Sequence, residues 1–109
     1  LYNHKVTPHR VIDPKVCSMM VHCLRAVLTY GTGRKSQLTR PAAGKSGTSQ
    51  KHRDAWFIGF TPDLITGVWM GNDTETSMAQ LTGGVLPGRL WHDFMEDIHK
   101  NKPKRPFLP

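Results

Sequence analysis

The chain has 109 residues, of which 38% are apolar, and a formal net charge of +7 at pH 7. That length fits one domain or part of one, and the clustering of the apolar residues argues against disorder. No apolar run approaches the roughly 20 residues that a membrane-spanning helix needs. Because the chain opens at Leu1 without a methionine or a signal-like segment, we interpret it as a processed piece, which leaves room for a targeting segment upstream.

The first predicted elements precede residue 31. Residues 1–12 are basic and include three β-branched apolar residues, which predicts a strand or hairpin arm. Asp13 is a favourable helix N-cap and Pro14 a favourable first helical residue, and Gly31 ends the helix. The apolar residues between them recur at helical spacing: Val16, Met19, Met20, Cys23, Leu24 and Val27. We predict that this helix packs in the core.

Two cysteines lie on the predicted helix. Cys17 and Cys23 are six residues apart, which turns them by about 240° around the axis and prevents a disulfide unless the helix unwinds. We predict two buried free thiols. The six histidines form no HExxH motif and pair with no cysteine cluster, so the sequence predicts no zinc site and no metal.

A polar, glycine-containing loop is predicted over residues 31–41. After it the sequence pattern changes from helical spacing to the two-residue alternation of a strand. Residues 44–50 are a predicted strand. Its side chains alternate, with Ser46 and Thr48 on one face and Lys45 and Gly47 on the other.

Two more strands follow, over residues 55–60 and 65–71, and are joined by a turn at residues 61–63 with proline at its second position. Apolar residues on both faces of these strands predict a sheet covered by helices on both sides. Asp54 is predicted to form a salt bridge or to cap a strand end. Four aromatic residues are predicted to pack in the core rather than to contact a ligand: Trp56, Phe57, Trp69 and Trp91.

The last predicted helix opens at Pro87 and Gly88, after a polar and glycine-rich loop over residues 72–86. Its apolar stripe consists of four residues: Trp91, Phe94, Met95 and Ile98. The tail, residues 101–109, is basic and proline-rich and is expected to fray. The predicted fold class is therefore α/β (α+β), with an antiparallel β-sheet flanked by helices.

The basic residues lie near both ends and in one central run: Lys5, Arg10 and Lys15; Arg34, Lys35 and Arg40; Lys100, Lys102, Lys104 and Arg105. A basic surface attracts polyanions, but no recognition motif with stacking aromatics accompanies these residues. Attraction to an anionic membrane or envelope polymer accounts for the charge equally well, and solvated surface side chains account for it with the fewest assumptions. We therefore predict no nucleic-acid partner.

The stretch Gly44-Lys45-Ser46 invites comparison with phosphate-binding loops. A Walker loop needs glycine at the position of Thr39. The other glycine-rich candidate, Gly31-Thr32-Gly33, has Ser36 where a dinucleotide fingerprint needs glycine, and it precedes no predicted helix. Both phosphate-loop interpretations fail, and the triplet taken alone would be an ordinary turn.

A lysine, a hydroxyl residue and a glycine at the head of a strand also form one wall of the site in acyl-serine transferases. Here the motifs GTGR, RPAAGKSGTS, DAWF, GND and TGGVLP follow one another in that order. From about Val11 to Met95 the chain resembles the C-terminal half of the transpeptidase domain of bifunctional class A penicillin-binding proteins. The resemblance implies that residues 1–109 are a partial domain of the penicillin-binding protein/β-lactamase-like fold. Ser46 replaces the family's usual threonine and keeps its hydroxyl, so we expect the change to be tolerated.

The resemblance also defines what the chain lacks. In this family two motifs that precede the lysine-hydroxyl-glycine triplet supply the nucleophilic serine, its base and a proton shuttle. No serine of this chain has lysine three residues later, and no Ser-x-Asn is present. We therefore predict that the nucleophile lies on a missing N-terminal half of the domain and that this chain alone is inactive.

The resemblance implies a substrate, a peptidoglycan stem peptide that ends in D-Ala-D-Ala and that penicillins mimic. Lys45 would supply positive potential for the terminal carboxylate and for the proton shuttle, and the hydroxyls of Ser46 and Thr48 would donate to that carboxylate. Gly47 would let the substrate backbone approach. The Thr48 N–H would join the nucleophile's own N–H in an oxyanion hole, with the substrate lying along the strand as an added strand.

The implied parent protein is a D,D-transpeptidase with a glycosyltransferase domain upstream. It would work at the periplasmic face of the bacterial inner membrane, held by an upstream anchor, without a cofactor. Its partners would be the stem peptide, β-lactams and the missing half of the domain. Two alternatives stay open: a non-catalytic module of the same fold that binds cell-wall peptide or a partner, and a basic polyanion-binding domain.

Overall fold

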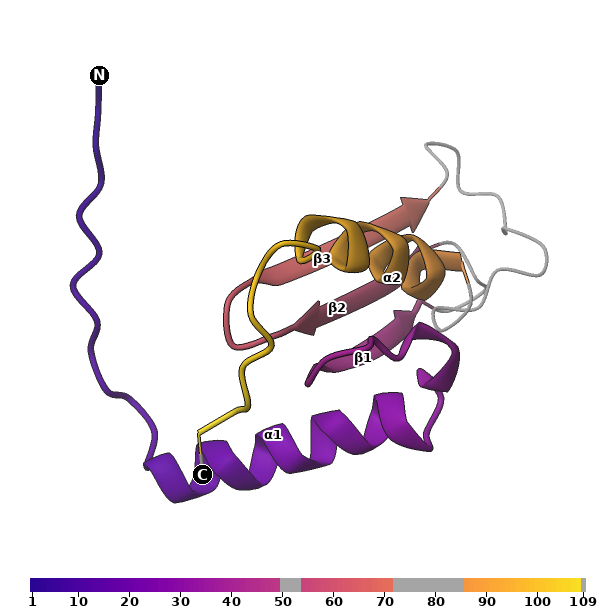
Figure 1. Ribbon diagram of the computed structural model, residues 1–109, viewed down its shortest axis with the longest axis horizontal. Coiled ribbons are helices and arrows are strands. Elements are labelled where there is room, and N and C mark those ends of the chain that lie inside the picture. The colour runs from indigo at the N-terminus through magenta and orange to yellow at the C-terminus, as the bar shows by residue number, and fades with distance from the viewer. Residues whose placement is uncertain (50–53, 72–85, 109) are drawn as a thin grey trace.

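The computed structural model describes residues 1–49, 54–71 and 86–108. In chain order the elements are α1 (Pro14–Thr29), the short 3₁₀ helix η1 (Arg34–Ser36), β1 (Ala43–Thr48), β2 (Asp54–Phe60), β3 (Ile65–Gly71) and α2 (Leu86–Ile98). The three strands form one antiparallel sheet in the order β1-β2-β3. Figure 1 shows α2 lying across the sheet and α1 running beside β1. The predicted fold class is confirmed.

The sheet is a meander whose register follows the predicted alternation. β1 pairs with β2 from Ala43↔Phe60 to Thr48↔Ala55, and β2 pairs with β3 from Asp54↔Gly71 to Phe60↔Ile65. At the turn between β2 and β3, the amide of Thr61 donates to the carbonyl of Leu64 at 2.9 Å. The turn predicted at residues 61–63 is therefore present.

One face of the sheet forms the core with the helices. On β2 the residues Ala55, Phe57 and Gly59 are buried. The centroid of the Phe57 ring lies 5.0 Å from that of the Trp91 ring on α2. The Trp91 indole N–H donates to the Gly59 carbonyl at 3.2 Å. A Cβ at residue 59 would stand 2.4 Å from the Trp91 ring, so only glycine allows this packing. The rest of the cluster comes from α1, the loop before β1 and α2: Leu28, Leu38, Ala42 and Met95.

The opposite face is not covered by the described part of the chain, which corrects the prediction of helices on both sides. Trp56, Ile58 and Trp69 are 44%, 46% and 49% exposed. Of the four aromatic residues predicted as core, Phe57 and Trp91 are therefore buried, whereas Trp56 and Trp69 are not. The alternation of a strand decides which residues share a face, but the neighbouring elements decide which face is covered.

The helix α1 begins as predicted but is not a core helix over most of its length. Asp13 caps it by accepting from the Lys15 amide at 2.8 Å, and within the helix only Leu28 is fully buried. Cys17 and Cys23 are free but exposed, so the prediction of buried thiols is wrong. Among the described helices and strands, α1 makes substantial contact with β1 and η1 only. Its exposed apolar residues include Val16, Met19 and Met20.

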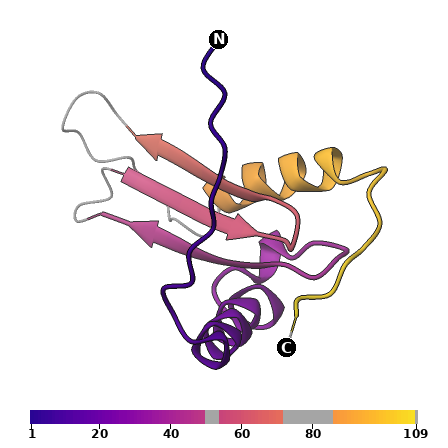
Figure 2. The ribbon, with the colours of Figure 1, turned by 90° about the vertical axis from the view of Figure 1, so that its left-hand side faces the viewer.

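The arm before α1 is not a strand. Residues 1–11 form no helix or strand, and their side chains are exposed. The arm runs apart from the sheet in Figure 1, and it passes in front of the sheet in the view of Figure 2. The predicted strand or hairpin arm is therefore wrong. A strand needs a partner for its backbone groups, and the described sheet edges lie elsewhere.

The helix α2 buries a narrower stripe than predicted. Trp91 and Met95 are fully buried, but Phe94 and Ile98 are 45% and 40% exposed. The buried line instead runs from Gly88 through Trp91 and Met95 to His99, at steps of three and four residues. The predicted loop before this helix lies outside the described residues, apart from its last residue.

Candidate functional site

The predicted site residues stand together on β1, the edge strand of the described sheet. Burial falls along this strand, because Ala43 and Gly44 are buried whereas Lys45, Gly47 and Thr48 are exposed. A Cβ at residue 44 would meet the Ile58 carbonyl and the Phe57 ring at 3.0 Å, so glycine lets the strand lie close to the core. One end of β1 is thus fixed in the core while its other end is presented at the surface.

The register places the four residues on two faces of the sheet, as predicted. Ser46 pairs with Phe57 and Thr48 with Ala55, so both hydroxyls lie on the face that packs against the helices. Lys45 and Gly47 pair with Ile58 and Trp56 on the open face. The lysine and the two hydroxyls therefore approach the strand edge from opposite sides of the sheet.

The backbone pattern defines which groups point out of the sheet. The amide of Ser49 donates to the carbonyl of its direct partner Asp54 at 2.9 Å. Hydrogen-bonded and non-hydrogen-bonded pairs alternate along an antiparallel ladder, so the backbone groups of Ser46 and Thr48 point away from β2. The Lys45 ammonium donates to the Ser46 carbonyl at 3.0 Å, which brings the charge to this same edge.

An aromatic pair lies beside Gly47 on the open face. In register across the sheet, Gly47 is followed by Trp56 and then by Trp69. The two indoles are tilted by 49° with centroids 6.4 Å apart. Asp54 accepts from the Trp69 indole N–H at 3.0 Å, so its observed role is to hold an aromatic side chain. The predicted salt bridge of Asp54 is not among the ion pairs of the described residues. The backbone carbonyl of Asp54 accepts the hydrogen bond that closes the end of the β1–β2 ladder.

The loop that leads into β1 is anchored on α2. Glu96 accepts from the amide of Thr39 at 2.7 Å and from its hydroxyl at 3.0 Å. Partial burial acts to raise the pKa of the Glu96 carboxyl, but these two hydrogen bonds and the charges of His92 and Arg40 outweigh it and hold the pKa below its ordinary value. The Glu96 side chain is therefore a charged carboxylate when it fixes the loop at the start of β1.

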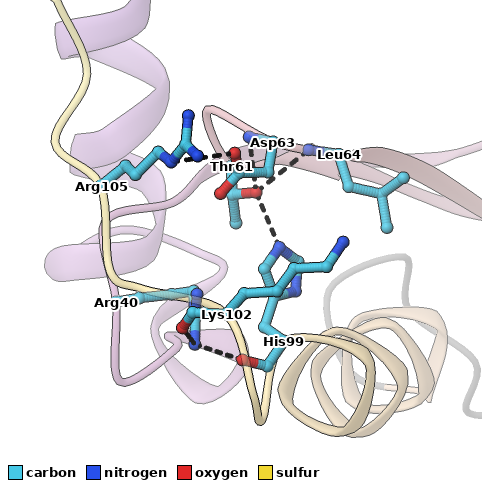
Figure 3. Close-up of polar contacts among 7 residues, drawn as sticks. All are labelled: Arg40, Thr61, Asp63, Leu64, His99, Lys102 and Arg105. Atoms are coloured by element: carbon cyan, nitrogen blue, oxygen red, sulfur yellow. Dashed lines mark hydrogen bonds and ion pairs between the residues drawn. The ribbon is translucent and has the colours of Figure 1, made fainter.

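A buried histidine at the end of α2, His99, anchors the β2–β3 turn to that helix (Figure 3). The Thr61 hydroxyl oxygen accepts from the amides of Asp63 and Leu64, both at 3.2 Å. Its proton is therefore directed to Nε2 of His99 at 2.9 Å. Nδ1 of His99 lies 2.7 Å from the Met95 carbonyl, which can only accept, so Nδ1 carries the ring proton. The sequence pattern did not find this role, although His99 continues the buried stripe of α2.

Within the described ranges, no group of three or more His, Cys, Asp and Glu side chains is placed to hold a metal ion. The helices in those ranges are also too short or too polar to cross a membrane.

Proteins of known identity resemble the chain over most of its length. Penicillin-binding protein 1A of Aquifex aeolicus is 40% identical over 89 residues, 80% of this chain and 12% of that protein. Penicillin-binding protein 1A of Neisseria lactamica is 38% identical over 97 residues, 86% of this chain and 12% of that protein. Penicillin-binding protein 2D of Bacillus subtilis is 37% identical over 118 aligned positions, which cover the whole chain and 17% of that protein.

The fold has a counterpart of known structure as well. The crystal structure of penicillin-binding protein 1A from Haemophilus influenzae superposes with a TM-score of 0.77 over 92% of this chain and 17% of that one. Its sequence identity of 23% supports a shared fold only. The chain thus spans less than a fifth of the proteins that it matches. No protein-family model matches it.

Proposed function

Because the chain belongs to the penicillin-binding protein family, we propose that it is part of a peptidoglycan D,D-transpeptidase, which cross-links stem peptides through an acyl-serine enzyme. The observation that carries the proposal is the placement of Lys45, Ser46, Gly47 and Thr48 on the exposed end of an edge strand. A stem peptide ending in D-Ala-D-Ala would extend the sheet beside β1, and β-lactams would occupy the same place.

The carboxylate of that peptide is the group that β1 would recognise. Ser46 and Thr48 share one face of the strand, so their hydroxyls can donate to the same anion, while the Lys45 ammonium already lies at the strand edge. Hydrogen bonds to charged groups contribute about 1.5–3 kcal/mol each. These three donors are therefore enough to select a substrate with a free terminal carboxylate.

The oxyanion hole would use the backbone of the same strand. The ladder directs the Thr48 N–H away from β2, which is the direction in which a carbonyl of an added strand would lie. Loss of one oxyanion donor costs about 10²–10³ in rate in other acyl-transfer enzymes. Gly47 leaves the strand without a side chain beside this donor, so that the reacting carbonyl can approach.

The reacting serine belongs to another part of the parent protein. We infer that the rest of the transpeptidase domain supplies the nucleophile and its base, and that the parent works at the periplasmic face of the bacterial inner membrane. The chain alone should then form no covalent adduct with penicillin, although it carries five serines that could be acylated.

Intact-mass spectrometry with a fluorescent penicillin tests this proposal. The chain is incubated alone and then together with the upstream half of the domain, expressed separately. We expect no adduct on the chain alone and a stoichiometric adduct on the upstream half only when both pieces are present. An adduct on a serine of this chain would overturn the assigned roles, and a reassembled domain that is never acylated would indicate a non-catalytic module.

A further inference from the structure

The C-terminal segment, residues 102–108 and called here the C-terminal strap, contacts the rest of the fold although its composition predicts fraying. It forms no helix or strand, yet it runs from the end of α2 past the β2–β3 turn and finishes beside α1 (Figure 1). Contacts at three places along this path join it to the loop before β1, to the β2–β3 turn, and to both β2 and α1.

The first contact is at the start of the strap (Figure 3). The Arg40 guanidinium donates from Nη2 to the His99 carbonyl at 2.7 Å and to the Lys102 carbonyl at 3.4 Å. The amide of Lys102 also donates to the His99 carbonyl, at 3.0 Å. A guanidinium at the end of a helix satisfies carbonyl groups that have no partner within the helix. Because Arg40 lies in the loop that enters β1, this contact ties the strap to the site strand.

The second contact is with the turn between β2 and β3. Nε of Arg105 lies 3.5 Å from a carboxylate oxygen of Asp63, whose side chain is 19% exposed. The Arg105 side chain is 63% exposed, so this ion pair alone would contribute little. Its value is in fixing the direction of the strap, since Asp63 is itself held by the Thr61 hydroxyl.

The third contact uses one aromatic ring to join two elements. The Phe107 ring meets Phe60 of β2 edge to face, with centroids 5.7 Å apart and planes at 81°. The guanidinium carbon of Arg25, on α1, lies 5.6 Å from the centroid of the same ring. Edge-to-face aromatic pairs and cation–π contacts are both attractive, so Phe107 holds α1 and the sheet together.

We propose that the C-terminal strap is a structural clasp that fastens α1 to the sheet and so supports β1 from its helix side. Prolines at positions 103 and 106 restrict the strap before it docks, which lowers the entropy lost on docking. Between the strap and the first turns of α1 lies a cleft of about 430 Å³ whose lining includes Cys17, Val21, Pro62 and Phe107. The clasp is independent of any catalytic role of the parent.

The two cysteines of α1 provide a test with an internal control. Cys17 lines the cleft beside the strap, and Cys23 does not line it. Both are free and exposed, so we compare their rates of modification by a bulky maleimide in the full chain and in a variant that ends at Lys102. We expect removal of the strap to raise the rate at Cys17 relative to that at Cys23. If the ratio of the Cys17 rate to the Cys23 rate did not change, the proposal would be overturned, because either the strap does not dock or its docking does not hold α1.

A matched pair of substitutions tests the ring itself. Phe107 is partly buried between two elements, whereas its neighbour Leu108 is 88% exposed. We expect Phe107→Ala to lower the melting temperature by roughly 5 °C or more, given the typical strength of aromatic and cation–π contacts in a chain of this size. Leu108→Ala should leave the melting temperature unchanged. Equal effects of the two substitutions, or no effect of Phe107→Ala, would contradict the clasp.

Discussion

At the scale of single residues, the proposed mechanism depends most on Lys45. Its ammonium contacts only the Ser46 carbonyl among the hydrogen bonds of the described residues, and its side chain is exposed. Its removal should therefore leave folding intact. In the complete parent, we expect Lys45→Ala to slow acylation by about 10- to 100-fold, the loss of one charged hydrogen bond in the transition state.

Two ligand types separate binding of the carboxylate from other roles of Lys45. The loss should be larger for a β-lactam with a free carboxylate than for its ester, because only the free acid pairs with the ammonium. Ser46→Thr keeps the hydroxyl and should leave both rates nearly unchanged. If Lys45→Ala slowed both ligands equally, a role in proton transfer would replace the role as carboxylate anchor.

Asp54 offers a second residue-scale prediction, because its carboxylate holds the indole of Trp69. We expect Asp54→Ala to free that indole, to weaken the near-ultraviolet circular dichroism of the tilted tryptophan pair, and to cost about 1 kcal/mol of unfolding free energy. Asp54→Asn retains an acceptor oxygen and should behave like the unaltered chain.

Gly71→Ala tests the same arrangement from the other side. A Cβ there would stand 2.3 Å from the Trp69 ring and 2.8 Å from the Asp54 carboxylate, so it should displace the indole and produce the same spectral change. A spectrum that is identical in Asp54→Ala, Gly71→Ala and the unaltered chain would show that the hydrogen bond does not order the pair.

At the scale of elements, periodicity predicted which residues share a strand but not which strands are covered. Trp56 and Phe57 are adjacent aromatic residues of β2, yet one is 44% exposed and the other fully buried. Both are large aromatic residues, and the difference arises because α2 packs on one face only. The same reasoning explains α1, whose stripe includes the exposed Met19 and Met20. For the candidate site, the alternation of Lys45 and Ser46 was predictable because it needs only the period of a strand.

The hydrogen bonds between Thr39, in the loop before β1, and Glu96 of α2 predict that the stability of the fold depends on pH. The pKa of Glu96 is lower in the folded chain than its ordinary value of 4.5, so the folded state binds this proton more weakly than the unfolded state does. The stabilising contribution of Glu96 is therefore complete above about pH 4.5 and is lost as the pH falls through the lower folded pKa. We expect Glu96→Gln to flatten the acid limb of the stability curve, measured by urea unfolding between pH 3 and 6.

The next carboxylate along α2 serves as the control for this experiment. Within the described residues, the Asp97 carboxylate forms an exposed ion pair with Lys100, at 3.1 Å, and Asp97→Asn should leave the acid limb as steep as in the unaltered chain. An acid limb that Glu96→Gln does not change would remove the Thr39 contact from the account of how β1 is anchored.

At the scale of the whole molecule, the uncovered face of the sheet and the edge of β1 lie together. Trp56, Ile58 and Trp69 form an apolar surface, and Lys45 stands on the same face in register with Ile58. Large exposed apolar patches mark contact surfaces, and the relatives are about six to eight times longer than the part that they share with this chain. We therefore propose that this face meets the remainder of the transpeptidase domain, with the site lysine at the rim of the contact.

The chain on its own should consequently associate through this face. An apolar face and an open strand edge both favour self-association, and the net charge of +7 opposes it less as salt screens the repulsion. We expect light scattering to detect oligomers that grow with ionic strength. We expect Trp69→Lys to shift them toward monomer, at a cost of about 1 kcal/mol of unfolding free energy for the lost hydrogen bond to Asp54. Leu90→Lys places the same charge on an exposed residue of α2 and should not change the association. If both substitutions acted alike, charge rather than the sheet face would control the association. A monomer that melts cooperatively at every salt concentration would mean that the chain is a self-sufficient domain.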